Sequence, residues 1–223
     1  PTLAQLNALG VTGVTADNLA AVQAAIAATA NDGSGVDSLS ELQTIASNAA
    51  AQAAAAITTI SDAAQANTAT ATTPAATVYS AAGVTGVTDG NLAAINNALN
   101  SAAVTGALTD TAAEIQDLVT AYVAILAGAD ADASNDNATA ITAQYTAIGV
   151  TDATDRTTSL VNDRIDGLSA TEVDTVAQVQ ALVSAAAAVM SGAAAGTAPT
   201  LAQLNALGVT GVTADNLAAV QAA

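Results

Sequence analysis

The feature that most constrains this chain is a long internal repeat. Residues 199–223 read PTLAQLNALGVTGVTADNLAAVQAA, and residues 1–25 have the same sequence, 198 positions earlier. An identity of this length does not arise by chance, so the chain holds one long repeat and the beginning of the next. We therefore expect it to be part of a longer tandem array, in which Pro1 is not the natural amino terminus.

A shorter motif recurs inside the long repeat. The string GVTGVT begins at Gly10, Gly83 and Gly208 and becomes GVTDAT at Gly149, so the intervals are 73, 66 and 59 residues. Four positions before each glycine stands a large apolar residue: Leu6, Tyr79, Tyr145 or Leu204. Twelve and sixteen positions after the first three glycines stand the pairs Val22 and Ile26, Ile95 and Leu99, and Val161 and Ile165. Because side chains four residues apart share one face of a helix, each pair predicts a buried helix face.

A third landmark predicts where longer helices begin. The segment 37–43 reads DSLSELQ, and it aligns with DTAAEIQ at 110–116 and DTVAQVQ at 174–180. Each contains a capping box, in which Ser or Thr and a Glu or Gln three residues later bond the free N–H groups of the first turn. Since a carboxylate at a helix start is stabilising in itself, we interpret these acidic residues as structural and not as a catalytic acid–base pair.

Together the landmarks predict an all-α fold of tandem three-helix units that form a repeat array. The expected units are 1–73, 74–138 and 139–198, and residues 199–223 begin the next copy. In each unit a short helix ends at the glycine, which is free to adopt φ > 0, and Thr15, Thr88 or Thr154 caps a second helix. The expected first helices are 2–9, 75–82 and 139–148; the second are 16–28, 89–103 and 155–166; the third end near 66, 127 and 190. No stretch alternates with a period of two, so no strand is expected.

The third helix of the first unit carries no charge between Glu41 and Asp62 and has Ala on every side. A helix on the surface of a monomer normally has a charged face. Either neighbours cover this helix on several sides, or it exposes Ala to water, which solvent tolerates. We favour the first interpretation, so the expected partners are copies of the chain itself or neighbouring repeats. Residues 175–198 are also uncharged, but Gln and Ser dilute them and no basic flank follows, so membrane insertion is not expected.

Composition excludes many chemistries. The chain has no His, no Cys and no Lys, and 19 acidic residues against two Arg give a formal net charge of −17. It therefore lacks an imidazole base, a thiol nucleophile, disulfides and a Schiff-base lysine, and we expect no enzymatic activity. Two arginines cannot offset this charge toward phosphate, so nucleic acid is not an expected partner. The negative field favours divalent cations instead.

One loop has the oxygen ligands of a weak calcium site. Asp130, Asp132, Ser134 and Asp136 place side-chain oxygens at alternate positions, as at the start of an EF-hand loop. The loop lacks the glycine and the bidentate glutamate of that motif at its sixth and twelfth positions. A solvated loop between helices is the simpler interpretation, and weak calcium association is the alternative. No other cofactor is expected.

The pattern GVTGVT, then NLAAV, then the capping-box helix start resembles the Ala/Thr-rich helical repeat regions of giant bacterial secreted and surface proteins, the repetitive adhesins that type I systems export. The resemblance covers essentially the whole chain. The third unit departs from it at GVTDAT and at Thr158, where Leu19 and Leu92 stand in the other units, and this departure predicts a more exposed second helix.

The resemblance implies a secreted or cell-surface location in a bacterium and a structural role. We expect a segment that self-assembles into, or extends, a surface filament, sheath or layer. Resistance to proteolysis fits this location, because trypsin can cut only after Arg156 and Arg164. The alternative is an adhesive module that binds a host or surface ligand. Ice binding would need Thr in a regular rank on a flat face, whereas Thr here gathers in links and caps.

Overall fold

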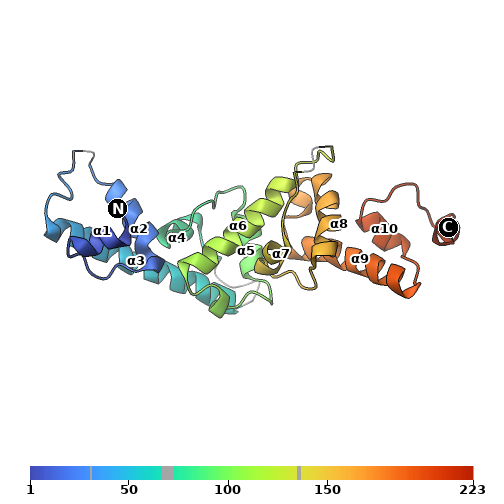
Figure 1. Cartoon of the computed structure of the whole chain (residues 1–223), viewed down its shortest axis with the longest axis horizontal. Helices are drawn as coiled ribbons and strands as arrows, with labels where there is room; N and C mark the ends of the chain where they lie inside the picture. The colour runs from blue at the N-terminus through green and yellow to red at the C-terminus, as the bar shows by residue number, and fades with distance from the viewer. Residues whose placement is uncertain (31, 67–72, 135–136, 223) are drawn as a thin grey trace. The chain divides into compact units, whose positions relative to one another are not determined.

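The computed structural model describes residues 1–30, 32–66, 73–134 and 137–222, and in this part of the chain it is helical and has no strand (Figure 1). The prediction of an all-α fold is confirmed for these residues. One isolated antiparallel bridge joins Asp130 and Ser169. The chain divides into two compact parts, an amino-terminal lobe, Pro1–Val119, and a carboxyl-terminal lobe, Thr120–Ala223.

The helices follow one another along the chain with short connections. The amino-terminal lobe contains α1 (Leu3–Ala8), α2 (Ala16–Ala27), α3 (Leu39–Ala66), α4 (Ala76–Ala81), α5 (Leu92–Leu99) and the 3₁₀ turn η1 (Gly106–Leu108). The boundary of the lobes falls within α6 (Ala112–Gly128). The carboxyl-terminal lobe contains α7 (Thr142–Ala147), α8 (Asp155–Asp166), the 3₁₀ turn η2 (Ala170–Glu172), α9 (Val176–Ala195), α10 (Leu201–Ala206) and α11 (Leu217–Gln221).

Capping side chains set the starts of the three longest helices. Ser38, Thr111 and Thr175 directly precede α3, α6 and α9, and their hydroxyl oxygens accept the N–H three residues later at 3.2, 3.2 and 3.3 Å. The backbone N–H groups of the same three residues donate to the Glu or Gln side chain at that later position. These reciprocal bonds satisfy donors that a helix start otherwise leaves open. The three predicted capping boxes are confirmed.

The predicted bounds of three helices are wrong. α5 covers only Leu92–Leu99 instead of 89–103: residues 89–91 form turns before it, so Thr88 does not directly cap a helix as Thr15 and Thr154 do, and the chain turns after Asn100, where the Ser101 N–H donates to the Ala98 carbonyl. α7 begins at 142 instead of 139, since the Ala140 carbonyl is bonded to α8 and not to a helical turn. α9 continues past 190 to Ala195, because only small residues follow there, and it ends at Gly196 with φ of 68°.

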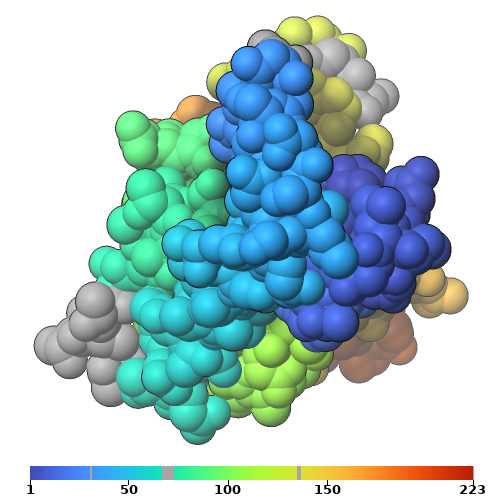
Figure 2. Space-filling view, turned by 90° about the vertical axis from the view of Figure 1, so that its left-hand side faces the viewer, coloured from blue at the N-terminus to red at the C-terminus, as the bar shows by residue number. Residues whose placement is uncertain are grey.

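The predicted core positions are buried, except Ile26, which is half-buried against the core. The first two helices, the connection between them and the start of α3 form one cluster: Leu6, Val11, Val14, Val22, Leu42, Ala46 and Ala49. Figure 2 shows the start of the chain, in dark blue, at the surface beside the lighter blue segment that leads into α3. Among the later predicted pairs, Ile95, Leu99, Val161 and Ile165 are buried, and so are all three tyrosines. Small side chains on α3 allow α2 to approach it closely.

Two expectations about exposure concern the described residues of α3 and α8. Within this chain α3 is covered along one side: its buried residues include Ala46, Ala53 and Ile60, while Ala51 and Ala55 are exposed on the other side. Cover of that other side by copies of the chain or neighbouring repeats stays a prediction. The prediction that the second helix of the third unit is more exposed is wrong: α8 has five buried residues, whereas α2 has two. Thr158 is among the buried residues of α8, and its hydroxyl donates to the Asp155 carbonyl at 3.1 Å.

Candidate functional site

The recurring polar contacts of this chain centre on four connections, 10–15, 83–88, 149–154 and 208–213, which we name the glycine links. The first and second glycines of the first link have φ of 88° and 79°, and the corresponding glycines of the second and fourth links are also positive. In the third link Asp152 holds φ of 60° where the others have glycine. Only glycine adopts this left-handed backbone without strain, so the links depend on the motif's glycines.

A glutamine clamps each of the first three links. The Gln43 side chain accepts the Thr12 backbone N–H at 2.9 Å and donates to the Thr12 carbonyl at 3.0 Å, so that one amide pairs with both backbone groups of one residue. Gln116 makes the same two bonds with Thr85 at 2.8 and 3.1 Å, and Gln180 makes them with Thr151 at 2.8 and 3.2 Å. Each glutamine belongs to a capping-box helix start, so each clamp fixes a link to the long helix of its unit, α3, α6 or α9.

A second amide ties the segment before each link to the helix after it. In each case the donor is the side-chain NH₂ of the residue 13 positions after the first glycine of the link. The acceptor is the backbone carbonyl nine positions before that glycine. The four pairs are Gln23 with Pro1 at 2.7 Å, Asn96 with Pro74 at 3.0 Å, Asn162 with Ala140 at 2.8 Å, and Gln221 with Pro199 at 2.8 Å.

The type of amide that forms this tie varies together with the large residue four positions before the first glycine of the link. Where the tie is asparagine, a buried tyrosine donates to its Oδ1: Tyr79 to Asn96 at 2.7 Å and Tyr145 to Asn162 at 2.5 Å. Where the tie is glutamine, leucine stands in place of tyrosine. Burial raises the pKa of both tyrosines well above its usual range. The longer amide thus accompanies the shorter apolar residue.

These contacts were missed by the sequence prediction, although their signals are readable. The glutamine was part of the aligned motif, but its partner lies on a different element and only folding reveals it. The exchange of Tyr with Leu and of Asn with Gln is visible as paired changes at constant spacing.

The predicted calcium ligands are engaged within their own loop. Asp130 accepts the Asp132 N–H at 3.0 Å and the Asn137 amide at 2.7 Å, and Asp132 accepts the Ser134 N–H at 3.1 Å. Asp136 lies outside the described residues. In the part of the chain that the structure places, no three His, Cys, Asp or Glu side chains gather as a metal site would require. Weak calcium association stays a prediction.

A buried carboxylate fixes the segment that directly follows this loop. Asp166, the last residue of α8, is almost fully buried and accepts the N–H groups of Asn137 and Ala138 at 3.0 and 3.4 Å. A buried carboxylate needs such donors, and this one fixes the segment that leads to α7. Nothing in its sequence position distinguishes Asp166 from the exposed acidic residues nearby.

The acidic pairs at helix starts have the geometry of caps. Glu41 accepts the hydroxyl and the N–H of Ser38 at 2.7 and 3.1 Å, and these bonds lower its pKa. Its hydrogen bond with the Asp37 carboxyl and the repulsion between the two groups raise the pKa of Asp37. Asp110 and Glu114 behave in the same way. Both pairs lie in solvent at helix starts, where capping accounts for them.

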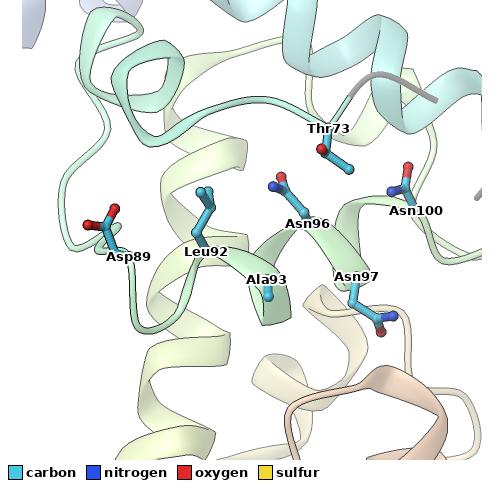
Figure 3. A pocket seen from close by; sticks show the side chains of 7 residues that line it. All are labelled: Thr73, Asp89, Leu92, Ala93, Asn96, Asn97 and Asn100. Carbon is cyan, nitrogen blue, oxygen red and sulfur yellow. The ribbon is translucent and has the colours of Figure 1, made fainter. Parts of the chain in front are cut away.

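A polar hollow of about 670 Å³ lies beside α5. Figure 3 shows Leu92, Asn96 and Asn100 on the side of α5 that faces Thr73, while Asn97 points away. Asp89 stands at the other end of the hollow, on the connection before the helix. Amide and carboxylate groups of this kind hydrogen bond to neutral polar ligands such as hydroxyls.

Among the described helices, α9 has the length and composition to cross a membrane. Two of its polar side chains are bonded to loops of the protein: Gln178 to the Thr171 carbonyl and Gln180 to Thr151. No known protein family, curated protein or solved structure matches this chain.

Proposed function

We propose that this chain is a structural segment of a bacterial extracellular protein, built as a tandem array of three-helix units that extends or assembles into a surface filament, sheath or layer. One observation carries the proposal: the same frame of left-handed link and amide tie is formed at four places, and the glutamine clamp at three of them. A catalytic site does not require the same scaffold to be rebuilt several times along the chain, whereas a repeat array does.

The composition supports the same role. A chain without His, Cys or Lys offers little for catalysis, and its strong negative charge keeps an extended array soluble. Between Glu41 and Asp62 the exposed side of α3 is uncharged and rich in Ala, Ser and Thr, and such a surface lets another helix approach closely. Copies of the chain or neighbouring repeats are therefore the proposed partners.

Electron microscopy of the native material tests this proposal. Stacked three-helix units should advance by about 60–120 Å for each 198-residue period, given ~1.5 Å of rise per helical residue. We expect regular fibres or layers with an axial spacing in this range. Separate compact particles without a regular spacing would contradict a structural array.

The polar hollow beside α5 favours a second candidate, an adhesive module. Asp89, which is exposed at one end of the hollow, offers carboxylate oxygens to the hydroxyls of a glycan. Saturable binding of the monomeric chain on a glycan array, lost in Asp89→Ala and kept in Asp62→Ala, would support adhesion. Asp62 is a suitable control because it is an exposed aspartate on α3, outside the hollow. The structural proposal expects no saturable binding by any of the three proteins.

A further inference from the structure

The polar hollow beside α5 has a counterpart in the carboxyl-terminal lobe. This second hollow is lined by residues 139–142 and by α8, and its volume is about 320 Å³. Both volumes fall in the range of about 300–1,000 Å³ that is typical of ligand pockets. The two linings share three positions relative to the first glycine of their links. Ten positions before that glycine stands Thr73 or Thr139, six after it Asp89 or Asp155, and thirteen after it Asn96 or Asn162.

Helix capping alone does not explain the shared aspartate. Asp155 is the first residue of α8, where a carboxylate stabilises a helix start. Asp89 holds the same position in a turn, three residues before α5 begins. At the first and fourth links this position is Ala16 or Ala214, and α2 begins at Ala16. In the two units that contain a hollow, aspartate therefore holds this position whether or not a helix begins there.

The aspartate and the threonine of each hollow are open to a ligand. The Asp89 and Asp155 carboxylates are exposed at the hollows that they line. Thr73 and Thr139 are exposed as well. In the first hollow the aspartate and the threonine stand at opposite ends, so one ligand can contact both (Figure 3). Asp155 accepts the Thr142 hydroxyl at 2.7 Å, but two carboxylate oxygens have room for several donors.

The rest of each wall is fixed and partly apolar. Asn96 and Asn162 are each bonded to a tyrosine hydroxyl and to a backbone carbonyl, so they shape the hollow instead of serving a ligand. Leu92 lines the first hollow, and Ile141, which is 62% exposed, lines the second. None of the described residues that line either hollow is basic. A carboxylate and a hydroxyl beside an apolar side chain suit a neutral ligand with several hydroxyl groups and disfavour an anion.

We propose that the two hollows are equivalent binding sites for a neutral carbohydrate, in which the aspartate accepts hydrogen bonds from sugar hydroxyls and the threonine hydroxyl adds another. This inference rests on the adhesive candidate and extends it to a second site, with Asp155 and Thr139 as its ligand-binding residues. Weak sites repeated along one chain gain avidity without any new contact. Loss of Asp89 alone therefore releases the chain from a dense glycan surface, although the second site remains.

NMR titration of the full-length chain resolves the two sites. The probes are glucose, galactose and N-acetylglucosamine, each added to about 50 mM, since single weak sites bind with Kd in the millimolar range. With at least one sugar we expect saturable shifts of the amide signals of Ala93 and Ser159, which line the first and second hollows at the same position. Asp89→Ala should weaken binding at least tenfold at Ala93 only, and Asp155→Ala at Ser159 only. The control Asp62→Ala, at an exposed aspartate of α3, should change neither.

The outcomes separate this inference from the function on which it rests. Saturable shifts at Ala93 alone would overturn the second site and leave the adhesive candidate standing. No saturable shift at either residue would overturn the adhesive candidate as well. Shifts at Ser159 that Asp155→Ala leaves unchanged would overturn the assigned binding residues. If Asp155→Ala loses helical circular dichroism, Thr139→Val, which removes one hydroxyl at an exposed site outside the helices, replaces it and should weaken binding at Ser159 at least threefold.

Discussion

Exchanging Tyr79 and Asn96 for the leucine and glutamine of the first link tests whether the two side chains are matched. Tyr79 is fully buried and donates to Asn96 Oδ1 at 2.7 Å, and Asn96 in turn donates to the Pro74 carbonyl at 3.0 Å. At the first link, Leu6 is buried and Gln23 reaches the Pro1 carbonyl at 2.7 Å without a tyrosine. The double variant Tyr79→Leu with Asn96→Gln therefore rebuilds an arrangement that the chain already contains.

The single changes should each be costly. Tyr79→Leu removes buried aromatic volume, which destabilises by about 2–4 kcal/mol, and it leaves Asn96 Oδ1 without its donor, at about 1–3 kcal/mol more. Asn96→Gln adds a methylene beside a tyrosine that has no room for it, at about 1–3 kcal/mol. In the double variant the longer amide occupies space that the tyrosine leaves. We expect its destabilisation to be smaller than the sum of the singles by about 1–3 kcal/mol.

Urea unfolding of the four proteins, followed by circular dichroism, measures this coupling as a double-mutant cycle. The control cycle combines Asn96→Gln with Tyr122→Leu, because Tyr122 is also buried but donates to the Val173 carbonyl and not to an asparagine. That cycle should be additive within about 0.5 kcal/mol. A Tyr79–Asn96 coupling no larger than the control would refute the matching of the two positions.

Three further predictions follow from the links and the buried tyrosines. Gln43→Ala removes both hydrogen bonds to Thr12 and should lower the local stability of the first link by about 1–2 kcal/mol, so amide exchange at Thr12 becomes about 5–30 times faster. The control Gln52→Ala, at an exposed site of α3, should leave that exchange rate unchanged. Asp152→Gly relieves a left-handed aspartate and should raise the urea midpoint by the equivalent of about 0.5–1 kcal/mol, whereas Gly86→Asp at the matching position of the second link should lower it. Burial raises the pKa of all three tyrosines, so their contribution to stability is complete below pH ~10, the pKa of an unfolded tyrosine, and is lost as the pH rises above it. Tyrosinate absorbance at 295 nm should therefore rise only together with unfolding. Ionisation of the tyrosines in the folded chain would contradict this.

Features encoded by neighbouring residues could be predicted from the sequence. A capping box joins residues three apart, so Ser38 and Glu41 show their relation without the rest of the fold. The buried pairs such as Ile95 and Leu99 follow from helical periodicity in the same way. The bounds of α5 were missed because a local pattern does not fix where a helix ends: residues 16–18 are helical in α2, whereas the identical residues 214–216 form turns before α11.

Contacts between distant residues could not be predicted. The clamp joins Gln43 to Thr12, 31 residues apart, and its donors and acceptors are backbone groups that no residue type announces. Asp166 resembles its exposed neighbours in sequence and differs only because the chain folds two N–H groups onto it. What covers the exposed side of α3 could not be read from the sequence for a related reason: an uncharged helix face does not by itself show what lies against it.

The spacing of these contacts explains why the glycine links recur at unequal intervals. From the residue whose carbonyl accepts the tie to the clamped threonine, the spacing along the chain is always eleven residues. From that threonine to the clamping glutamine, the spacing is 31, 31 and 29 residues in the three units. From the glutamine to the next tied carbonyl it is 31, 24 and 19 residues. Most of the variation therefore falls beyond the clamp, where helix length is free to change. In the longest interval the added turns of α3 are held by Ser61 and Gln65, which bond both backbone groups of Gly106 at 2.9 and 3.2 Å. A repeat built this way keeps its hydrogen-bonded frame constant and changes its period beyond the clamp, through the length of the long helix and of the connection that follows it: α6 is shorter than α9, yet its interval is longer. In the longest interval the added turns of the helix have partners of their own.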